Sequence, residues 1–301
     1  MTALEELLRR GPPTQTLQWV VEAAGLGGRI VGVESLGGKW LACHAVDIHD
    51  RHGGLHRFVL RRWVRPGWEE DDPEFTAEQE ARTLALVAES SVPAPVLVAA
   101  DADGAVCDAP AILTTRLPGR PPRFPPDMRS FLSQLAGALP AIHSVNGRVQ
   151  ELVPAFKRYH DVAEVDVPPW TRQPRLWERA LSIAGGIGPD DVESFIHRDY
   201  HQGNTLWRRG GLTGIVDWTA ASWGPPGIDV AHMRWNLAME YSVDAADDFL
   251  AAHAAVTDEP LESQPYWDLV TFIDVLPEMP TLSPQDIERA EEYLATVVAR
   301  I

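Results

Sequence analysis

The stretch from residue 194 to residue 218 contains the residues best suited to chemistry. Asp199 and Asn204 are 5 positions apart, and Asp217 follows Asn204 after 13 positions. Phosphoryl transfer depends on positioning and charge neutralisation, and it uses a carboxylate that accepts or orients the proton of the attacking hydroxyl. Magnesium prefers hard oxygen ligands. Asp199 suits the first task, and Asn204 and Asp217 can offer an amide oxygen and a carboxylate to the metal.

The two segments read HRDYHQGN and IVDW. They resemble the catalytic loop and the metal-binding aspartate of the aminoglycoside phosphotransferase and choline kinase-like family, which are small-molecule relatives of protein kinases. The family usually has a glycine where this chain has Arg198, and a proline is common where it has Gln202. Neither residue is a reacting group. In this resemblance His197 supports the loop.

The resemblance implies an α+β, bilobal protein kinase-like fold. Residues 1–117 would form a nucleotide-binding N-lobe, an antiparallel sheet with one packed helix. Residues 118–301 would form a mostly helical C-lobe with the catalytic loop and the substrate site. Hydrophobic periodicity and breakers predict strands at 29–35, 39–47, 55–64, 96–100 and 111–117, and helices at 3–10, 15–24, 127–145, 173–184, 244–256, 263–277 and 284–299. A further helix is predicted after Thr76, where a capping signal begins.

Two expected strands are joined by a turn that contains Gly37 and Gly38. By itself this pair is typical of an ordinary hairpin. In a kinase-like N-lobe the hairpin covers the nucleotide phosphates, and glycine lets backbone N–H groups approach them. The resemblance therefore assigns Gly37, Gly38 and the hydroxyl of Ser35 to the nucleotide.

Arg61 stands where a kinase has its phosphate-binding lysine, at the end of a strand on which Val59 shares its face. The resemblance assigns both residues to the nucleotide, although Arg61 and Arg62 could be charges at a strand edge. Glu80 falls on the apolar stripe of the next helix, and a carboxylate there needs a partner. Since a kinase-like fold pairs this helix with the phosphate-binding base, we predict an ion pair between Glu80 and Arg61.

The breaker-rich run from Pro118 to Pro122 predicts a hinge between the lobes. An adenine ring would take backbone hydrogen bonds at this edge, from Thr115 and Leu117. Leu206, in the ribbon after Asn204, completes the predicted nucleotide contacts. Asp229 begins a helix, where a carboxylate meets free N–H groups. The resemblance gives it the structural role of bracing the catalytic loop.

The net charge of −17 argues against nucleic acid as a partner. Residues 240–301 hold 14 acidic and 2 basic side chains, which leaves −12 in that segment alone. Such a surplus fits either solvated helical faces or a site for a cationic substrate. Aromatic and acidic residues suit an amine-bearing alcohol, aminoglycoside-like or choline-like, unless they belong to the core. The candidates are Trp235, Glu240, Tyr241, Trp267, Asp268, Asp274 and Glu278.

Composition sets the remaining expectations. The chain has 301 residues and only 2 cysteines, which indicates a reducing compartment and no disulfide framework. The N-terminus lacks a secretory signal, and no apolar run is long enough to span a membrane. We expect a cytoplasmic protein, a monomer or a homodimer, without nucleic-acid or membrane partners.

The expected function is magnesium-dependent transfer of the γ-phosphate of ATP or GTP to a hydroxyl of a small molecule, with antibiotic resistance as one consequence. One alternative is a catalytically idle nucleotide-binding or interaction module. Another is a protein Ser/Thr kinase, although the run GPPGID follows Asp217 too soon for a peptide-docking segment. The loop could also be purely structural, or His197, Asp199 and His201 could form an H-x-D-x-H metal site of a hydrolase.

Overall fold

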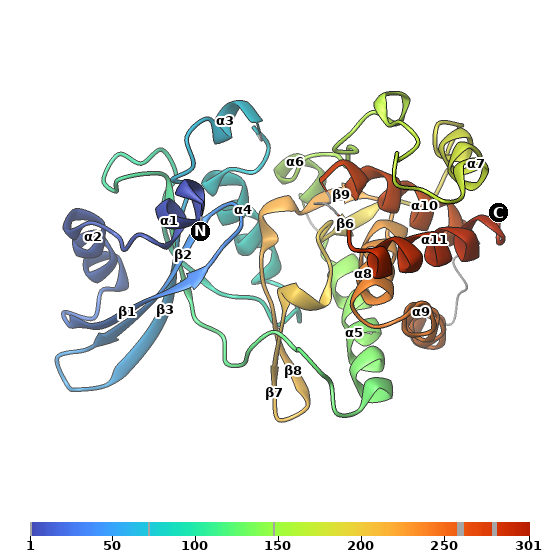
Figure 1. Cartoon of the computed structure of the whole chain (residues 1–301). Helices are drawn as coiled ribbons and strands as arrows, with labels where there is room; N and C mark the ends of the chain where they lie inside the picture. Colours follow the sequence, from blue (N-terminus) through green and yellow to red (C-terminus); the bar gives the residue numbers. More distant parts are fainter. Residues whose placement is uncertain (1, 72, 147, 258–261, 279–281) are drawn as a thin grey trace. The chain divides into compact units, whose positions relative to one another are not determined.

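A five-stranded antiparallel sheet is the centre of the first compact unit in the computed structural model (Figure 1). The structure describes residues 2–71, 73–146, 148–257, 262–278 and 282–301. The strands lie in the order β1-β2-β3-β5-β4. Their bounds are β1 (Arg29–Gly37), β2 (Ala42–His49), β3 (Leu55–Arg62), β4 (Leu97–Asp101) and β5 (Ala111–Thr115).

The alternation of side chains along β2 and β3 gives the sheet two different faces. Val46, Ile48 and Leu60 are fully buried on one face, where they form a core cluster with Val20 of α2 (Thr14–Ala24). The other face carries Arg61. Because β3 lies between β2 and β5, Arg61 is on an interior strand, and the strand-edge alternative for it is wrong.

Helix α4 (Ala77–Val87) starts where the sequence predicted, because the Thr76 hydroxyl accepts a hydrogen bond from the Gln79 N–H. Its buried residues include Leu84, Val87 and Glu80. Two short helices complete this part of the chain, α1 (Ala3–Arg9) and α3 (Trp68–Asp71). The sheet unit consists of Met1–Pro118 and Gly214–Ala220.

The second compact unit, Gly119–Thr213 with Ala221–Ile301, is mostly helical. Its helices are α5 (Met128–His143), α6 (Val149–Leu152), α7 (Pro174–Ala184), α8 (Gly227–Glu240), α9 (Val243–Thr257), α10 (Gln264–Val275) and α11 (Pro284–Val298). Helix α5 passes through Pro140 without interruption. Among the described residues, no helix is both long and apolar enough to cross a bilayer.

Short strands flank the segment that contains Asp199 and Asn204. β6 (Ser194–Ile196) pairs with β9 (Ser222–Gly224), and β7 (Thr205–Arg208) pairs with β8 (Gly211–Ile215). Arg209 and Gly210 connect β7 to β8 with positive φ angles of 54° and 79°, as a tight hairpin turn requires.

A buried ion pair joins two helices of the second unit. Arg234 of α8 is 1% exposed and pairs with Asp268 of α10, which is fully buried. Arg234 also donates to Asp247 of α9 at 2.6 Å. Each buried charge therefore depends on the other for compensation.

We predict that Asp268→Ala lowers the free energy of unfolding by about 3–5 kcal/mol, because it leaves the buried Arg234 without its most buried partner. Chemical denaturation measures this loss. Arg300→Ala is the control, since Arg300 pairs with Asp247 at the surface and its removal should cost about 1 kcal/mol or less. Equal losses for the two variants would contradict the assignment.

Candidate active site

Asp229 holds the start of the catalytic loop. Its side chain is fully buried at the first turn of α8. Oδ2 accepts the N–H of His197 at 2.9 Å, and Oδ1 accepts the N–H of Arg198 at 2.7 Å. His143 Nε2 lies 3.1 Å from Oδ2. These contacts are those expected of an aspartate that braces the loop.

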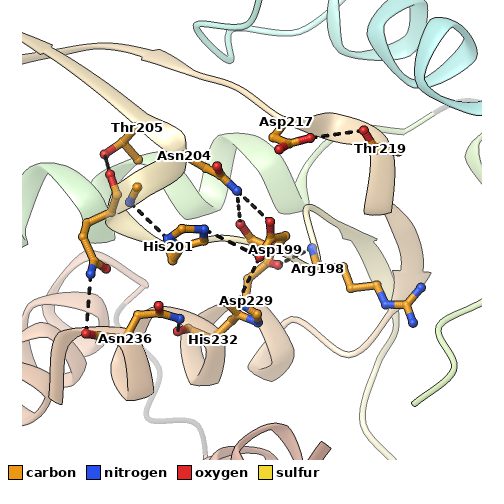
Figure 2. Close-up of polar contacts among 12 residues, drawn as sticks. Arg198, Asp199, His201, Asn204, Thr205, Asp217, Thr219, Asp229, His232 and Asn236 are labelled. Carbon is orange, nitrogen blue, oxygen red and sulfur yellow. Dashed lines mark hydrogen bonds and ion pairs between the residues drawn. The ribbon is translucent and has the colours of Figure 1, made fainter. Parts of the chain in front are cut away.

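The Asp199 carboxylate is held at both oxygens (Figure 2). Oδ2 accepts a hydrogen bond from Asn204 Nδ2 at 2.8 Å. Oδ1 lies 3.0 Å from His232 Nε2 and 3.7 Å from His201 Nε2. Burial by itself raises the pKa of Asp199, but His201 and the hydrogen bond from His232 outweigh it and hold that pKa well below its usual range. Asp199 is therefore ionised at neutral pH.

Arg198 adopts a conformation that favours glycine. Its φ is 66°, in the left-handed region, at the position where the resembling family usually has a glycine. The side chain is buried: it donates to the Lys157 carbonyl at 2.6 Å, and its guanidinium lies 4.2 Å from the centre of the Tyr159 ring. These contacts tie the catalytic loop to the segment before α7 and offset the backbone strain.

In the sheet unit, Arg61 lies between two carboxylates. Its Nε is 3.2 Å from Glu80 Oε2, so the predicted ion pair is present, and its Nη2 is 2.6 Å from Asp217 Oδ1. The Thr219 hydroxyl accepts from Arg61 Nη2 at 2.9 Å and lies 3.0 Å from Glu80 Oε2. The guanidinium of Arg61 therefore forms ion pairs with both Glu80 and Asp217.

Burial and the neighbouring opposite charges shift the pKa values of Arg61 and Glu80 in opposite directions. Burial by itself lowers the pKa of Arg61, but Asp217 and Glu80 raise it, so the guanidinium stays charged. Burial raises the pKa of Glu80 to about 7 against the effect of Arg61. Asp217 is the accessible member, with a side chain that is 42% exposed. Arg61 Nη2 at 2.6 Å and Thr219 Oγ1 at 3.1 Å both contact Oδ1 of Asp217, so Oδ2 is the oxygen that a ligand could use.

The turn that contains Gly37 and Gly38 lies in register with Arg61 in the sheet. Gly37 pairs with Cys43, and Cys43 pairs with Arg61, which places the three residues in one row. A side chain at Gly38 is excluded, because a Cβ there would lie 2.0 Å from the Leu41 carbonyl oxygen. The Ser35 hydroxyl accepts the Gly37 N–H at 3.3 Å, which holds the turn.

The structure narrows which backbone groups of the predicted adenine edge can act as donors. Thr115 is the last residue of β5, and its N–H already donates to the Val96 carbonyl at 2.9 Å. This hydrogen bond occupies the Thr115 N–H, so Leu117 is the predicted donor and the carbonyl of Thr115 stays a predicted contact. Beyond the hinge, Arg120 pairs with Trp207 of β7. Leu206, next to Trp207, points to the opposite face of that strand and is half-buried.

Two of the predicted acceptor-site residues are wrong. The carboxylate of Asp268 forms the buried ion pair with Arg234. Asp274 is 5% exposed, and its two oxygens accept the N–H groups of Tyr159 at 3.0 Å and His160 at 2.8 Å. Both carboxylates are internal acceptors, because a buried carboxylate requires such partners. Neither is available to a substrate.

The other predicted acceptor-site residues differ in accessibility. Trp267 lines a cavity of about 680 Å³ together with Phe156, Trp223, Asp190, Asp191 and Glu193. Trp235 packs near Phe272, and the Tyr241 hydroxyl donates to the Arg123 carbonyl at 3.4 Å. Glu240 is exposed at the end of α8. The side chain of Glu278 lies outside the described part of the structure.

Three residues that contact the predicted site residues were not predicted from the sequence. Thr219 follows Asp217 by two positions, and His201 was considered only as a metal ligand. His232 lies three positions after Asp229, so both face the loop from the same side of α8, and that spacing was the available signal.

The described residues contain no group of three or more His, Cys, Asp or Glu side chains that could hold a metal, so the H-x-D-x-H alternative lacks structural support.

Comparisons with known proteins agree with this geometry. Residues 44–299 match the model of the family described as "Phosphotransferase enzyme family". No curated protein matches. A thermostable mutant of aminoglycoside phosphotransferase APH(4)-Ia, solved with ADP and hygromycin B, is 14% identical, with a TM-score of 0.64 over 95% of this chain and 99% of its own.

Two further solved structures are similar. Macrolide 2'-phosphotransferase MphH from Brachybacterium faecium is 19% identical, with a TM-score of 0.58 over 92% of this chain and 97% of its own. Amicoumacin kinase hAmiN, solved with AMP-PNP, Ca²⁺ and Ami, is 13% identical, with a TM-score of 0.59 over 94% and 93% of the two chains. The predicted kinase-like α+β fold is confirmed.

The strain at Arg198 can be measured with two variants. Arg198→Ala and Arg198→Gly both lose the guanidinium contacts, but only glycine accepts the positive φ without penalty. We expect the glycine variant to be the more stable by about 1–2 kcal/mol in chemical denaturation. An alanine variant at least as stable as the glycine variant would show that the loop does not hold this conformation.

Proposed function

Because the chain belongs to the phosphotransferase enzyme family, we propose that it transfers the γ-phosphoryl group of ATP or GTP to a hydroxyl of a small molecule. The observation that carries this proposal is the Asp199–Asn204 pair, held by α8 at the end of a buried strand. An ionised carboxylate and an amide in this arrangement suit phosphoryl transfer, in which positioning and charge neutralisation dominate.

In this proposal Asp199 orients the acceptor hydroxyl. A carboxylate with a pKa well below its usual range is a weak base, so full proton removal before attack is unfavourable. Such a base is sufficient when the transition state is loose and the nucleophile needs alignment more than activation. Asp199 then accepts the hydroxyl proton as the acceptor O–P bond forms and the γ-phosphoryl bond to the departing nucleoside diphosphate breaks.

The charges of the Arg61 cluster favour a divalent cation. Arg61, Glu80 and Asp217 carry a net charge of −1 when all are ionised, which does not attract a triphosphate without a cation. Asp217 has an accessible carboxylate, and Asn204 uses its amide nitrogen on Asp199, which directs its amide oxygen elsewhere. Both are the hard oxygen donors that Mg²⁺ prefers, so we assign these two residues to the metal. When bound, the metal neutralises charge on the transferring phosphoryl group.

The remaining nucleotide contacts are assigned by position. Arg61 meets the phosphates, and Glu80 and Thr219 hold its guanidinium in place. The backbone of Gly37 and Gly38 covers the phosphates, with Ser35 beside them. The adenine or guanine ring contacts are assigned to Val59, Leu206 and the backbone of Thr115 and Leu117.

We also propose that the acceptor bears amines. The cavity beside Trp267 combines aromatic faces with the carboxylates of Asp190 and Glu193, which suit a cation. Glu193 precedes Asp199 by six positions, so the chain between them spans at most roughly 20 Å. The proposed acceptor is therefore an amine-bearing alcohol, either aminoglycoside-like or choline-like.

Asp199→Ala should reduce phosphoryl transfer by about 10²–10⁴-fold, because the acceptor loses its orienting base. The assay measures nucleotide consumption with magnesium–ATP and magnesium–GTP over a panel of amine-bearing and neutral alcohols. Asp217→Asn should be inactive as well, and the exposed Asp166→Asn serves as the control with unchanged turnover. Full activity in Asp199→Ala would contradict the proposal, as would transfer to peptides only.

The ion pair of Arg61 and Glu80 should influence nucleotide binding. A double-mutant cycle with Arg61→Met and Glu80→Gln, read as magnesium–ATP affinity by calorimetry, should show a coupling of about 0.5–3 kcal/mol. Coupling is expected because Glu80 acts on the nucleotide only through the arginine that it orients. Additive effects in folded variants would separate Glu80 from the nucleotide site.

A further inference from the structure

One face of α8 supports the catalytic loop at three points. Asp229, His232 and Asn236 occupy positions i, i+3 and i+7 of the helix, which lie on one side. Asp229 accepts backbone N–H groups of the loop, and Gln202 Nε2 donates to the Asn236 carbonyl at 3.4 Å. Between them, His232 meets the side chain of Asp199 rather than the loop backbone (Figure 2).

The hydrogen bond between His232 and Asp199 has a defined donor and acceptor. His232 is 8% exposed, and its Nε2 lies 3.0 Å from Asp199 Oδ1. Since Asp199 is an acceptor when ionised, Nε2 must carry the proton. His201 approaches the same oxygen at 3.7 Å, and its Nδ1 accepts the Gly203 N–H at 3.1 Å, which leaves its Nε2 as the donor. Two imidazoles therefore face Oδ1, and the shorter contact is that of His232.

We propose that His232 is a positioning residue for the catalytic carboxylate, an inference that rests on the proposed function of Asp199. With Oδ1 held by His232 and Oδ2 by Asn204, the carboxylate cannot rotate about its last bond. The acceptor hydroxyl then meets an oxygen of fixed direction. A misplacement of about 1 Å in such a site can reduce a rate roughly 10²-fold.

A purely structural role explains the contact less well. The loop backbone is already held by Asp229, and the Asp199 side chain is 34% exposed, so its pairing with His232 adds little to stability. The buried imidazole of His232 contacts one oxygen of the partly exposed Asp199 carboxylate. This contact fixes the orientation of the carboxylate. Its location on a long helix gives the donor a rigid base.

The test compares two substitutions at one position. His232→Leu removes the donor, and His232→Gln offers an amide N–H near the place of Nε2. With magnesium–ATP and water as acceptor, we expect kcat to fall at least tenfold in the leucine variant, with KM for ATP within twofold of wild type. The glutamine variant should recover most of the rate. His253→Leu, which changes another buried histidine of the same unit, is the control with unchanged kcat.

A second readout needs no turnover. Nitrogen NMR of selectively labelled histidine should show the His232 proton on Nε2, and the signal should move in Asp199→Asn. An unchanged signal in Asp199→Asn, or a leucine variant within twofold of wild-type kcat, would overturn the inference and leave the proposed function intact. A wild-type enzyme without turnover on any acceptor would instead contradict the proposed function.

Discussion

A buried carboxylate at the start of α8 holds the catalytic loop in a conformation that its own residues disfavour. Asp229 accepts two successive backbone N–H groups, from His197 and Arg198, while Arg198 adopts a positive φ. The φ of Arg198 turns the chain directly after these two N–H groups. The direction in which Asp199 leaves the loop depends on this arrangement, so every contact of Asp199 depends on it too.

Arg198 shows how a departure from the usual family residue is accommodated. A glycine would adopt the positive φ without strain, and an arginine adds a penalty of about 1–2 kcal/mol. The arginine side chain offsets this penalty by stacking on Tyr159 and donating to Lys157. That segment is in turn held by Asp274 through the N–H groups of Tyr159 and His160. The substitution thus joins the loop to a part of the chain that a glycine could not reach.

The acidic surplus of the C-terminal segment has a different meaning from the one that composition suggests. Asp268 compensates the buried Arg234, Asp274 accepts two backbone N–H groups, and Glu291 accepts from Thr171 and from the Arg172 N–H. These carboxylates are internal partners, so the net charge of the segment does not locate a cationic substrate. The acidic residues of the cavity beside Trp267, which we propose for the acceptor, lie before β6 and outside that segment.

The sequence by itself determined the fold class and the family, and it predicted the core of the catalytic set. Periodicity, a capping threonine and the spacing of Asp199, Asn204 and Asp217 are local features. A carboxylate on an apolar stripe requires a partner, and the resemblance to a kinase-like fold identified Arg61 as the partner of Glu80. Only the tertiary structure decided which carboxylates are internal, that the Thr115 N–H is occupied, and that His232 reaches Asp199. The physical reason is that burial and hydrogen-bond pairing depend on which distant segments pack together, and neither spacing nor composition encodes that convergence.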